Sequence, residues 1–172
     1  MRSGRYNASG EDELADYSSR GPTESAFVKP DVLVPSTRTI APVPDSSIVA
    51  MEIPQARIHE RADVDFALGR PDRRHTYYQL SGTSMGAAQV SGIVALMLQA
   101  NPGLTNEQVK YRLMATARPA VDEATGKPAY SIWEQGAGLV DARQAVLCDS
   151  APAEACALGI ANEGMDITRD LA

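Results

Sequence analysis

The longest apolar run in the chain covers residues 85–98 and is interrupted only by Gln89 and Ser91. The breaker sequence Asn101-Pro102-Gly103 follows it, as is usual after the C-terminus of a helix. The pattern therefore predicts a buried helix over residues 84–100. A run of this length is too short to cross a bilayer and is typical of a core helix, so we expect no membrane insertion.

Two further helices are predicted in the second half of the chain. Thr105 is followed three residues later by Gln108, the spacing of a capping box. The helix that it opens has apolar residues at helical spacing and ends near Ala117. Residues 119–138 are rich in turn-forming residues, and a short third helix is predicted over residues 141–147.

Strand signals are confined to two short segments. Residues 32–34 form a continuous apolar run bounded by prolines, typical of a buried parallel strand. Residues 77–80 predict a second strand. Between them, residues 41–76 contain four prolines and many charges, so we expect an irregular surface loop. Residues 1–16 are predicted to be loop.

Composition excludes several classes of function. The net charge is −6, and the nearest approach to a basic cluster is Arg70, Arg73 and Arg74, which we interpret as a solvated loop. Nucleic acid is therefore not an expected partner. Cys148 and Cys156 are the only cysteines, which is too few for a disulfide framework or a thiolate metal site. A local disulfide and two free thiols both remain open.

The candidate chemistry lies in the string Ser-Gly-Thr-Ser-Met-Gly-Ala-Ala-Gln-Val-Ser-Gly over residues 81–92. It places Ser84 between a glycine turn and a long helix, where backbone N–H groups lack partners and the helix dipole favours negative charge. Both features suit a nucleophile that generates an oxyanion beside it. The alternative is that Thr83 or Ser84 only caps the helix, a common role for hydroxyl residues.

Residues 82–86 also satisfy G-x-S-x-G, the nucleophile elbow of α/β-hydrolases. In that fold both the acid and the histidine follow the serine in the chain. The two histidines of this chain, His59 and His75, precede Ser84, so the elbow interpretation fails.

The fuller string resembles the nucleophile segment of the subtilases, the subtilisin-like serine peptidases (peptidase S8). Six residues match that segment: Gly82, Thr83, Ser84, Met85, Val90 and Gly92. Four other segments resemble the family in the same order: residues 16–22, 29–32, 96–117 and 136–142. The departures are Gly86 for alanine, Ala88 for proline, Gln89 for histidine, and Val34-Pro35-Ser36 for A-P-G.

The resemblance covers roughly residues 16–147 and implies an α/β fold. We expect residues 1–147 to be the C-terminal part of a subtilase catalytic domain, with a parallel sheet and flanking helices. Residues 148–172 would be a tail or the start of an extension. It also implies that Ser84 is the nucleophile and that its backbone N–H contributes to the oxyanion hole.

The resemblance further implies that the catalytic Asp and His, and the Asn of the oxyanion hole, precede the first matched segment. Residues 1–15 match none of these motifs. His59 and His75 lack the H-G-T-H context of the family's base, and we interpret both as loop residues. Asp31 and Asp45 are assigned to turns.

For the intact parent, the resemblance implies a polypeptide substrate, no cofactor for catalysis, and secretion by default. It also allows a structural calcium site, but no cluster of metal ligands in the sequence shows where that site would lie. This chain alone is expected to be inactive and to self-associate through the apolar side chains Val90, Ile93, Val94, Met97 and Leu98. The alternative function is an inert subtilase remnant that acts as an interaction or scaffold module. The coding sequence upstream of Met1 would distinguish the two functions: an in-frame continuation with an Asp motif and an H-G-T-H motif favours the protease, and a true start at Met1 favours the remnant.

Overall fold

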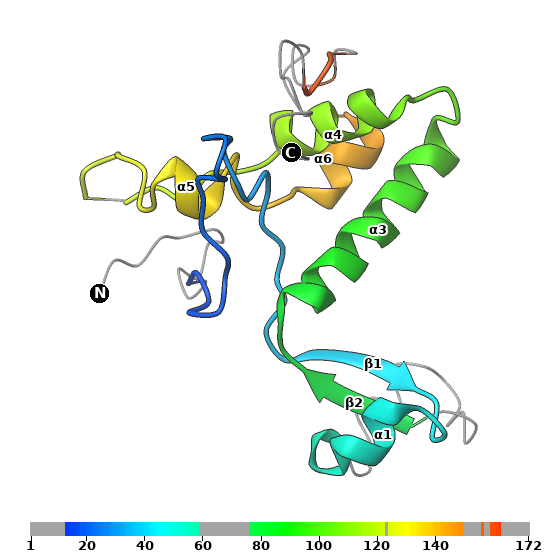
Figure 1. Ribbon diagram of the computed structural model, residues 1–172. Helices are drawn as coiled ribbons and strands as arrows, with labels where there is room; N and C mark the ends of the chain where they lie inside the picture. Colours follow the sequence, from blue (N-terminus) through cyan, green and yellow to red (C-terminus); the bar gives the residue numbers. More distant parts are fainter. Residues whose placement is uncertain (1–12, 59–75, 123, 150–155, 157–158, 163–172) are drawn as a thin grey trace. The chain divides into compact units, whose positions relative to one another are not determined.

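The computed structural model describes residues 13–58, 76–122, 124–149, 156 and 159–162 (Figure 1). It divides the chain into two compact units. The smaller unit is Pro35–Met85, and the larger unit combines Met1–Val34 with Gly86–Ala172. The predictions for His59, His75 and the arginines at 70, 73 and 74 lie outside the described residues, and the division at residue 147 stays a prediction.

The smaller unit contains an antiparallel ribbon of two strands, β1 (Thr39–Val43) and β2 (Thr76–Leu80). Thr39 lies opposite Leu80, and Pro42 lies opposite Tyr77. The strand at 77–80 is thereby confirmed. The expectation of an irregular loop is wrong at residues 41–43, because both strands of a two-stranded ribbon are edges, where proline is tolerated. The part of that prediction at residues 59–75 lies outside the described residues.

Two short helical segments follow β1 in the same unit, and they also depart from the predicted loop. Helix α1 (Ile48–Glu52) begins after Ser47, whose Oγ accepts a hydrogen bond from the Ala50 N–H at 3.2 Å. The 3-10 helix η1 (Pro54–Ala56) comes next, with proline in its first turn. Proline favours a helix start there, since its missing N–H has no intrahelical acceptor.

Helix α3 (Thr83–Ala100) confirms the predicted helix (Figure 1). The expectation that it is buried is wrong, because Gly86 and Met97 are the buried residues of the helix and most of the others are exposed or partly exposed. It ends as the breaker sequence requires, with the Asn101 N–H donating to the Met97 carbonyl at 2.9 Å. Asn101 Oδ1 then accepts from the Gly103 N–H at 3.3 Å. No helix in the described part of the chain is long and apolar enough to span a membrane.

The remaining helices belong to the larger unit. Helix α4 (Asn106–Ala115) has the predicted capping box between Thr105 and Gln108. Helix α6 (Ala142–Leu147) is also confirmed, with Asp141 as its N-cap. Helix α5 (Ile132–Gln135) was not predicted; it is one turn long and lies within the turn-rich segment.

Helices α3, α4 and α6 surround the main core. Its buried residues are Met97, Leu104, Val109, Leu113, Val140 and Ala145. Partly buried valines and Ile93 pack against them: Val32, Val34, Val90, Val94 and Val146. The expectation that Met97 loses cover is wrong, since it is fully buried here. Leu96 and Leu98 are 52% and 39% exposed.

The predicted parallel strand at 32–34 is reduced to one parallel bridge, between Leu33 and Leu139. The Leu33 N–H donates to the Gly138 carbonyl at 2.8 Å, and the Val140 N–H donates to the Leu33 carbonyl at 2.9 Å. Arg118 pairs with the other side of Leu139 in the antiparallel sense. Among the described residues, the predicted parallel sheet is thus represented by this single bridge, whereas the two-stranded sheet of β1 and β2 is antiparallel.

Candidate active site

Ser84 is the second residue of α3, and its side chain is exposed. Strand β2 ends at Leu80, so only Ser81 and Gly82 separate the strand from the helix. Gly82 has φ of +151°, a conformation that other residues rarely adopt, and its carbonyl accepts from the Met85 N–H at 3.0 Å. This strand–turn–helix arrangement confirms the predicted position of Ser84 in the first turn.

Hydrogen bonds from an upstream segment of the smaller unit fix the turn before Ser84. The Gly82 N–H donates to the Ser36 carbonyl at 3.2 Å. Ser81 Oγ accepts from the Arg38 N–H at 2.9 Å. These bonds hold the two residues just before α3 in place. Ser36 and Ser81 stand in the motifs named from sequence, but neither of these hydrogen bonds, nor the role of Arg38, was predicted.

The first turn of α3 has the properties that anion stabilisation requires. The N–H groups of Thr83 and Ser84 come too early in the helix to have intrahelical acceptors. The positive end of the helix dipole lies at the same place. No described residue forms a hydrogen bond with the Ser84 hydroxyl. The turn can therefore stabilise an oxyanion, whereas it contains no group that would activate the hydroxyl.

The described residues offer no base for Ser84 among the histidines or at Asp45. Both histidines, His59 and His75, lie among the residues that the structure does not describe. Asp45 Oδ1 accepts from Thr76 Oγ1 at 2.6 Å, which ties together the segments at one end of the β1–β2 ribbon. Asp45 thus has a structural role.

Asp31 also has a structural role, which goes beyond the turn to which the sequence assigned it. Its carboxylate forms ion pairs with Lys29 Nζ at 2.6 Å and Lys110 Nζ at 3.1 Å. Burial by itself would raise the pKa of Asp31, but the hydrogen bonds and charges of the two lysines outweigh burial and lower the pKa. Asp31 therefore links the 29–34 segment to α4.

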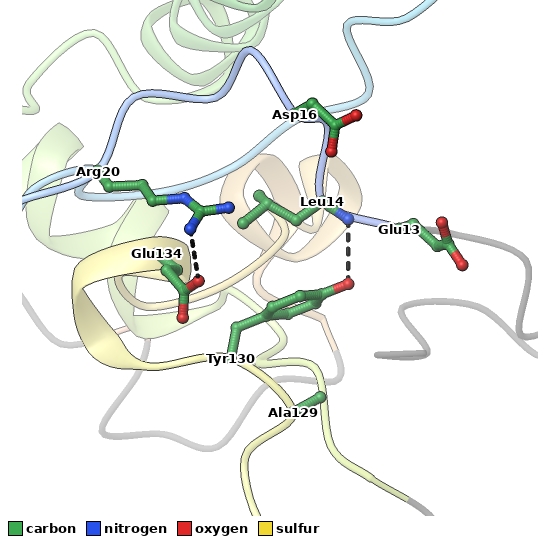
Figure 2. A pocket seen from close by; sticks show the side chains of 7 residues that line it. All are labelled: Glu13, Leu14, Asp16, Arg20, Ala129, Tyr130 and Glu134. Carbon is green, nitrogen blue, oxygen red and sulfur yellow. Dashed lines mark hydrogen bonds and ion pairs between the residues drawn. The ribbon is translucent and has the colours of Figure 1, made fainter. Parts of the chain in front are cut away.

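A pocket of about 230 Å³ lies in the larger unit (Figure 2). Tyr130 closes one side, and its hydroxyl accepts from the Leu14 N–H at 3.1 Å. Arg20 Nη1 lies 3.3 Å from Glu134 Oε1. The lining contains none of the predicted site residues, and its contacts fasten the 13–20 segment to residues 129–134.

The described part of the chain contains no group of three or more His, Cys, Asp or Glu residues able to hold a metal ion.

Comparison with known proteins places these features in a family. The sequence model of the subtilase family matches residues 4–138. Serine protease AprX of Bacillus subtilis (strain 168) is 35% identical over 103 residues, which cover 60% of this chain and 20% of AprX. Subtilisin-like protease SBT1.4 of Arabidopsis thaliana is 33% identical over 142 residues, covering 77% of this chain and 16% of that protease.

A third relative is the minor extracellular protease Vpr of Bacillus subtilis (strain 168), 29% identical over 140 residues, 81% of this chain and 14% of Vpr. Among solved structures, fervidolysin from Fervidobacterium pennivorans, a keratinolytic enzyme related to subtilisin, matches 69% of this chain and 15% of its own, with 27% identity and a TM-score of 0.45. The chain spans 14% to 20% of the length of these three curated relatives. The family match extends over most of the sequence and includes Ser84, so this chain, with its α/β fold, belongs to the subtilase family of serine peptidases.

Proposed function

We propose that this chain is the C-terminal part of the catalytic domain of a serine endopeptidase, with Ser84 as its nucleophile. One observation carries the proposal: Ser84 occupies the first turn of α3 directly after the Gly82 turn, within the region that matches the family. Neither a helix-capping role nor the hydrolase elbow accounts for the family match on both sides of the serine.

In the intact enzyme, Ser84 Oγ attacks the scissile carbonyl of a polypeptide substrate and forms an acyl-enzyme. An upstream histidine accepts the proton from Oγ and later delivers it to the leaving amine, while an aspartate orients the imidazole. The Ser84 N–H donates to the oxyanion from the end of the helix, where the helix dipole adds to its effect.

The chain by itself is expected to be inactive for two reasons. A serine hydroxyl without an adjacent base is a weak nucleophile. The side-chain donor of the oxyanion hole would also be supplied from upstream. In subtilisin, removal of that donor raises the free energy of the transition state by about 2.7–4 kcal/mol. The N–H groups of one helix turn do not offset both deficits.

The test is the Ser84→Ala variant of a parent protein in which the Asp and His motifs precede this chain. Peptide hydrolysis should fall by about 10⁶-fold, the loss known for the subtilisin nucleophile, while circular dichroism stays unchanged. Ser91→Ala is the matched control, because Ser91 lies on the same helix and donates only to the Ala87 carbonyl, at 2.9 Å. His75→Ala should change activity little. Hydrolysis that survives Ser84→Ala, or is equally lost in His75→Ala, would overturn the proposal.

A further inference from the structure

Helix α6 ends in a disulfide bond that the sequence left open. Cys148 is the C-cap of α6, in the left-handed conformation with φ of +52°. It is bonded to Cys156, and the two Cα atoms lie 5.8 Å apart. The bond returns the chain to the end of α6 after a separation of eight residues. The described residues 159–162 therefore follow shortly after a residue that is bonded to the end of α6.

Shortly after the disulfide, Asn162 is bound to one face of α4 by each of its polar groups except its carbonyl. The Asn162 N–H donates to Glu107 Oε2 at 2.9 Å. Its Nδ2 donates to both carboxylate oxygens of Glu107, at 2.8 and 3.0 Å. Lys110 Nζ donates to Asn162 Oδ1 at 2.6 Å. Glu107 and Lys110 are three residues apart and lie side by side on the helix, which suits them to hold one side chain.

The backbone at Gly159 makes a second contact with α4. A Cβ atom at this position would lie 2.5 Å from Cε2 of the Tyr111 ring, so only glycine fits against the ring. Ile160, in contrast, is 56% exposed. The segment is thus held by polar bonds and a close backbone contact, with little apolar burial. We call the contact of residues 159–162 with α4 the tail latch.

Opening the tail latch would not leave the Lys110 ammonium group without an oppositely charged partner. The same ammonium group also lies 3.1 Å from Asp31 Oδ1, so it retains a carboxylate partner when Asn162 leaves. The side chain of Lys110 is 28% exposed and accessible to water. The heavy penalty for an unpaired buried charge therefore does not arise at Lys110 when the latch opens.

We propose that the Cys148–Cys156 disulfide controls the tail latch, which opens more readily when the disulfide is reduced. With the bond intact, the path from the end of α6 to Asn162 passes through the disulfide and then six residues. With the bond reduced, the path is 14 residues long. Effective concentration falls roughly as the −3/2 power of tether length, so the open population should rise about 3.5-fold.

The chemical step is thiol–disulfide exchange with a dithiol. A thiolate of the dithiol attacks one sulfur of the bond and forms a mixed disulfide, and its second thiolate then displaces the chain sulfur. The dithiol loses two electrons and becomes a cyclic disulfide, while Cys148 and Cys156 each end as a thiol. Reoxidation reverses the exchange.

The test measures hydrogen exchange of the Asn162 amide in the full chain, with and without dithiothreitol. Reduction should accelerate this exchange about 3.5-fold and leave the Val109 amide, inside α4, unchanged. A Cys148→Ser/Cys156→Ser variant should show the fast rate in both conditions. Equal Asn162 exchange in the oxidised and reduced wild-type chain would overturn the proposal, whether or not the double variant folds.

A second variant tests the latch contact itself. Glu107→Ala removes the acceptor of three hydrogen bonds, so Asn162 exchange should rise to the same value in both redox states. Glu52→Ala is the matched control, because Glu52 is exposed at the end of α1 and should leave Asn162 exchange unchanged. Retained protection of Asn162 in Glu107→Ala would show that the disulfide acts on something other than this contact.

Discussion

A methyl group added at Gly136 should be one of the most damaging small changes in this chain. Gly136 follows α5 with φ of +57° and ψ of −129°, a conformation that L-residues with a side chain rarely adopt. A Cβ there would lie 2.5 Å from the Asp31 carbonyl oxygen and would also overlap the Pro30 carbonyl oxygen. Both are backbone atoms, so neither can rotate away. The Gly136→Ala variant therefore combines conformational strain with a steric clash.

The two effects have known sizes. A residue other than glycine in a sparsely populated backbone region costs about 1–3 kcal/mol. An extra methyl group forced into packed surroundings costs about 1–3 kcal/mol. The expected loss is thus about 2–6 kcal/mol, a large part of the roughly 5–15 kcal/mol that keeps a typical domain folded.

Two other glycines separate strain from clash. Gly126 has φ of +66° but nothing within 4 Å of its virtual Cβ, so Gly126→Ala should cost about 1–2 kcal/mol from strain alone. Gly92 lies within α3 with an ordinary φ and open space around it. Gly92→Ala should stabilise the chain by about 0.4–1 kcal/mol, because alanine loses less backbone entropy on folding.

Urea denaturation followed by the fluorescence of Trp133, the single tryptophan, measures all three variants. Trp133 lies in α5, close to Gly136, and reports on the larger unit. Stability should decrease in the order Gly92→Ala, wild type, Gly126→Ala, Gly136→Ala. If Gly136→Ala is no less stable than Gly126→Ala, the close approach of residues 30–31 to Gly136 is not present in solution.

Two further predictions concern charge and exposed surface. The lowered pKa of Asp31 implies that its ion pairs stabilise the fold above the unfolded pKa of about 3.9 and that this stabilisation is lost as pH falls through the folded pKa. Acid titration of unfolding should therefore show a loss of stability below about pH 4 that is smaller in Lys110→Met; an identical loss would contradict the ion pair. The exposed Leu96 and Leu98 should promote self-association, which Leu96→Gln/Leu98→Gln should reduce in sedimentation velocity; a wild-type chain that is already a monodisperse monomer would refute this.

The helices could be predicted from sequence because their signals are local. Helix α3 lies between the Gly82 turn and the breaker at 101–103, and α4 begins with the capping box at Thr105. Both sets of signals lie within a few residues of the helix ends that they determine. Helix α5 was missed because a single turn has too few positions to show a periodic pattern.

The strands and the support of the candidate site depended on contacts that local patterns do not reveal. Strand β1 contains Pro42 and becomes a strand only through its pairing with β2. The bond from Arg38 to Ser81 joins residues 43 positions apart. The motif predicted where Ser84 lies relative to its helix, but the contacts that fix the preceding turn required the structure. The same is true of the Cys148–Cys156 pairing, for which spacing alone allowed two outcomes.

Reactivity of Ser84 toward a fluorophosphonate probe tests most directly whether this serine is a nucleophile that depends on an upstream base. The probe should not label the purified chain, because no residue in the described part of the chain forms a hydrogen bond with the Ser84 hydroxyl and could activate it. A longer protein with the Asp and His motifs before this chain should be labelled at Ser84, as identified by peptide mass spectrometry, and Ser84→Ala should abolish the labelling. Labelling of the chain alone that disappears in Ser84→Ala would show that these 172 residues already contain a base. An unlabelled Ser84 in an active longer protein would show that the nucleophile lies elsewhere.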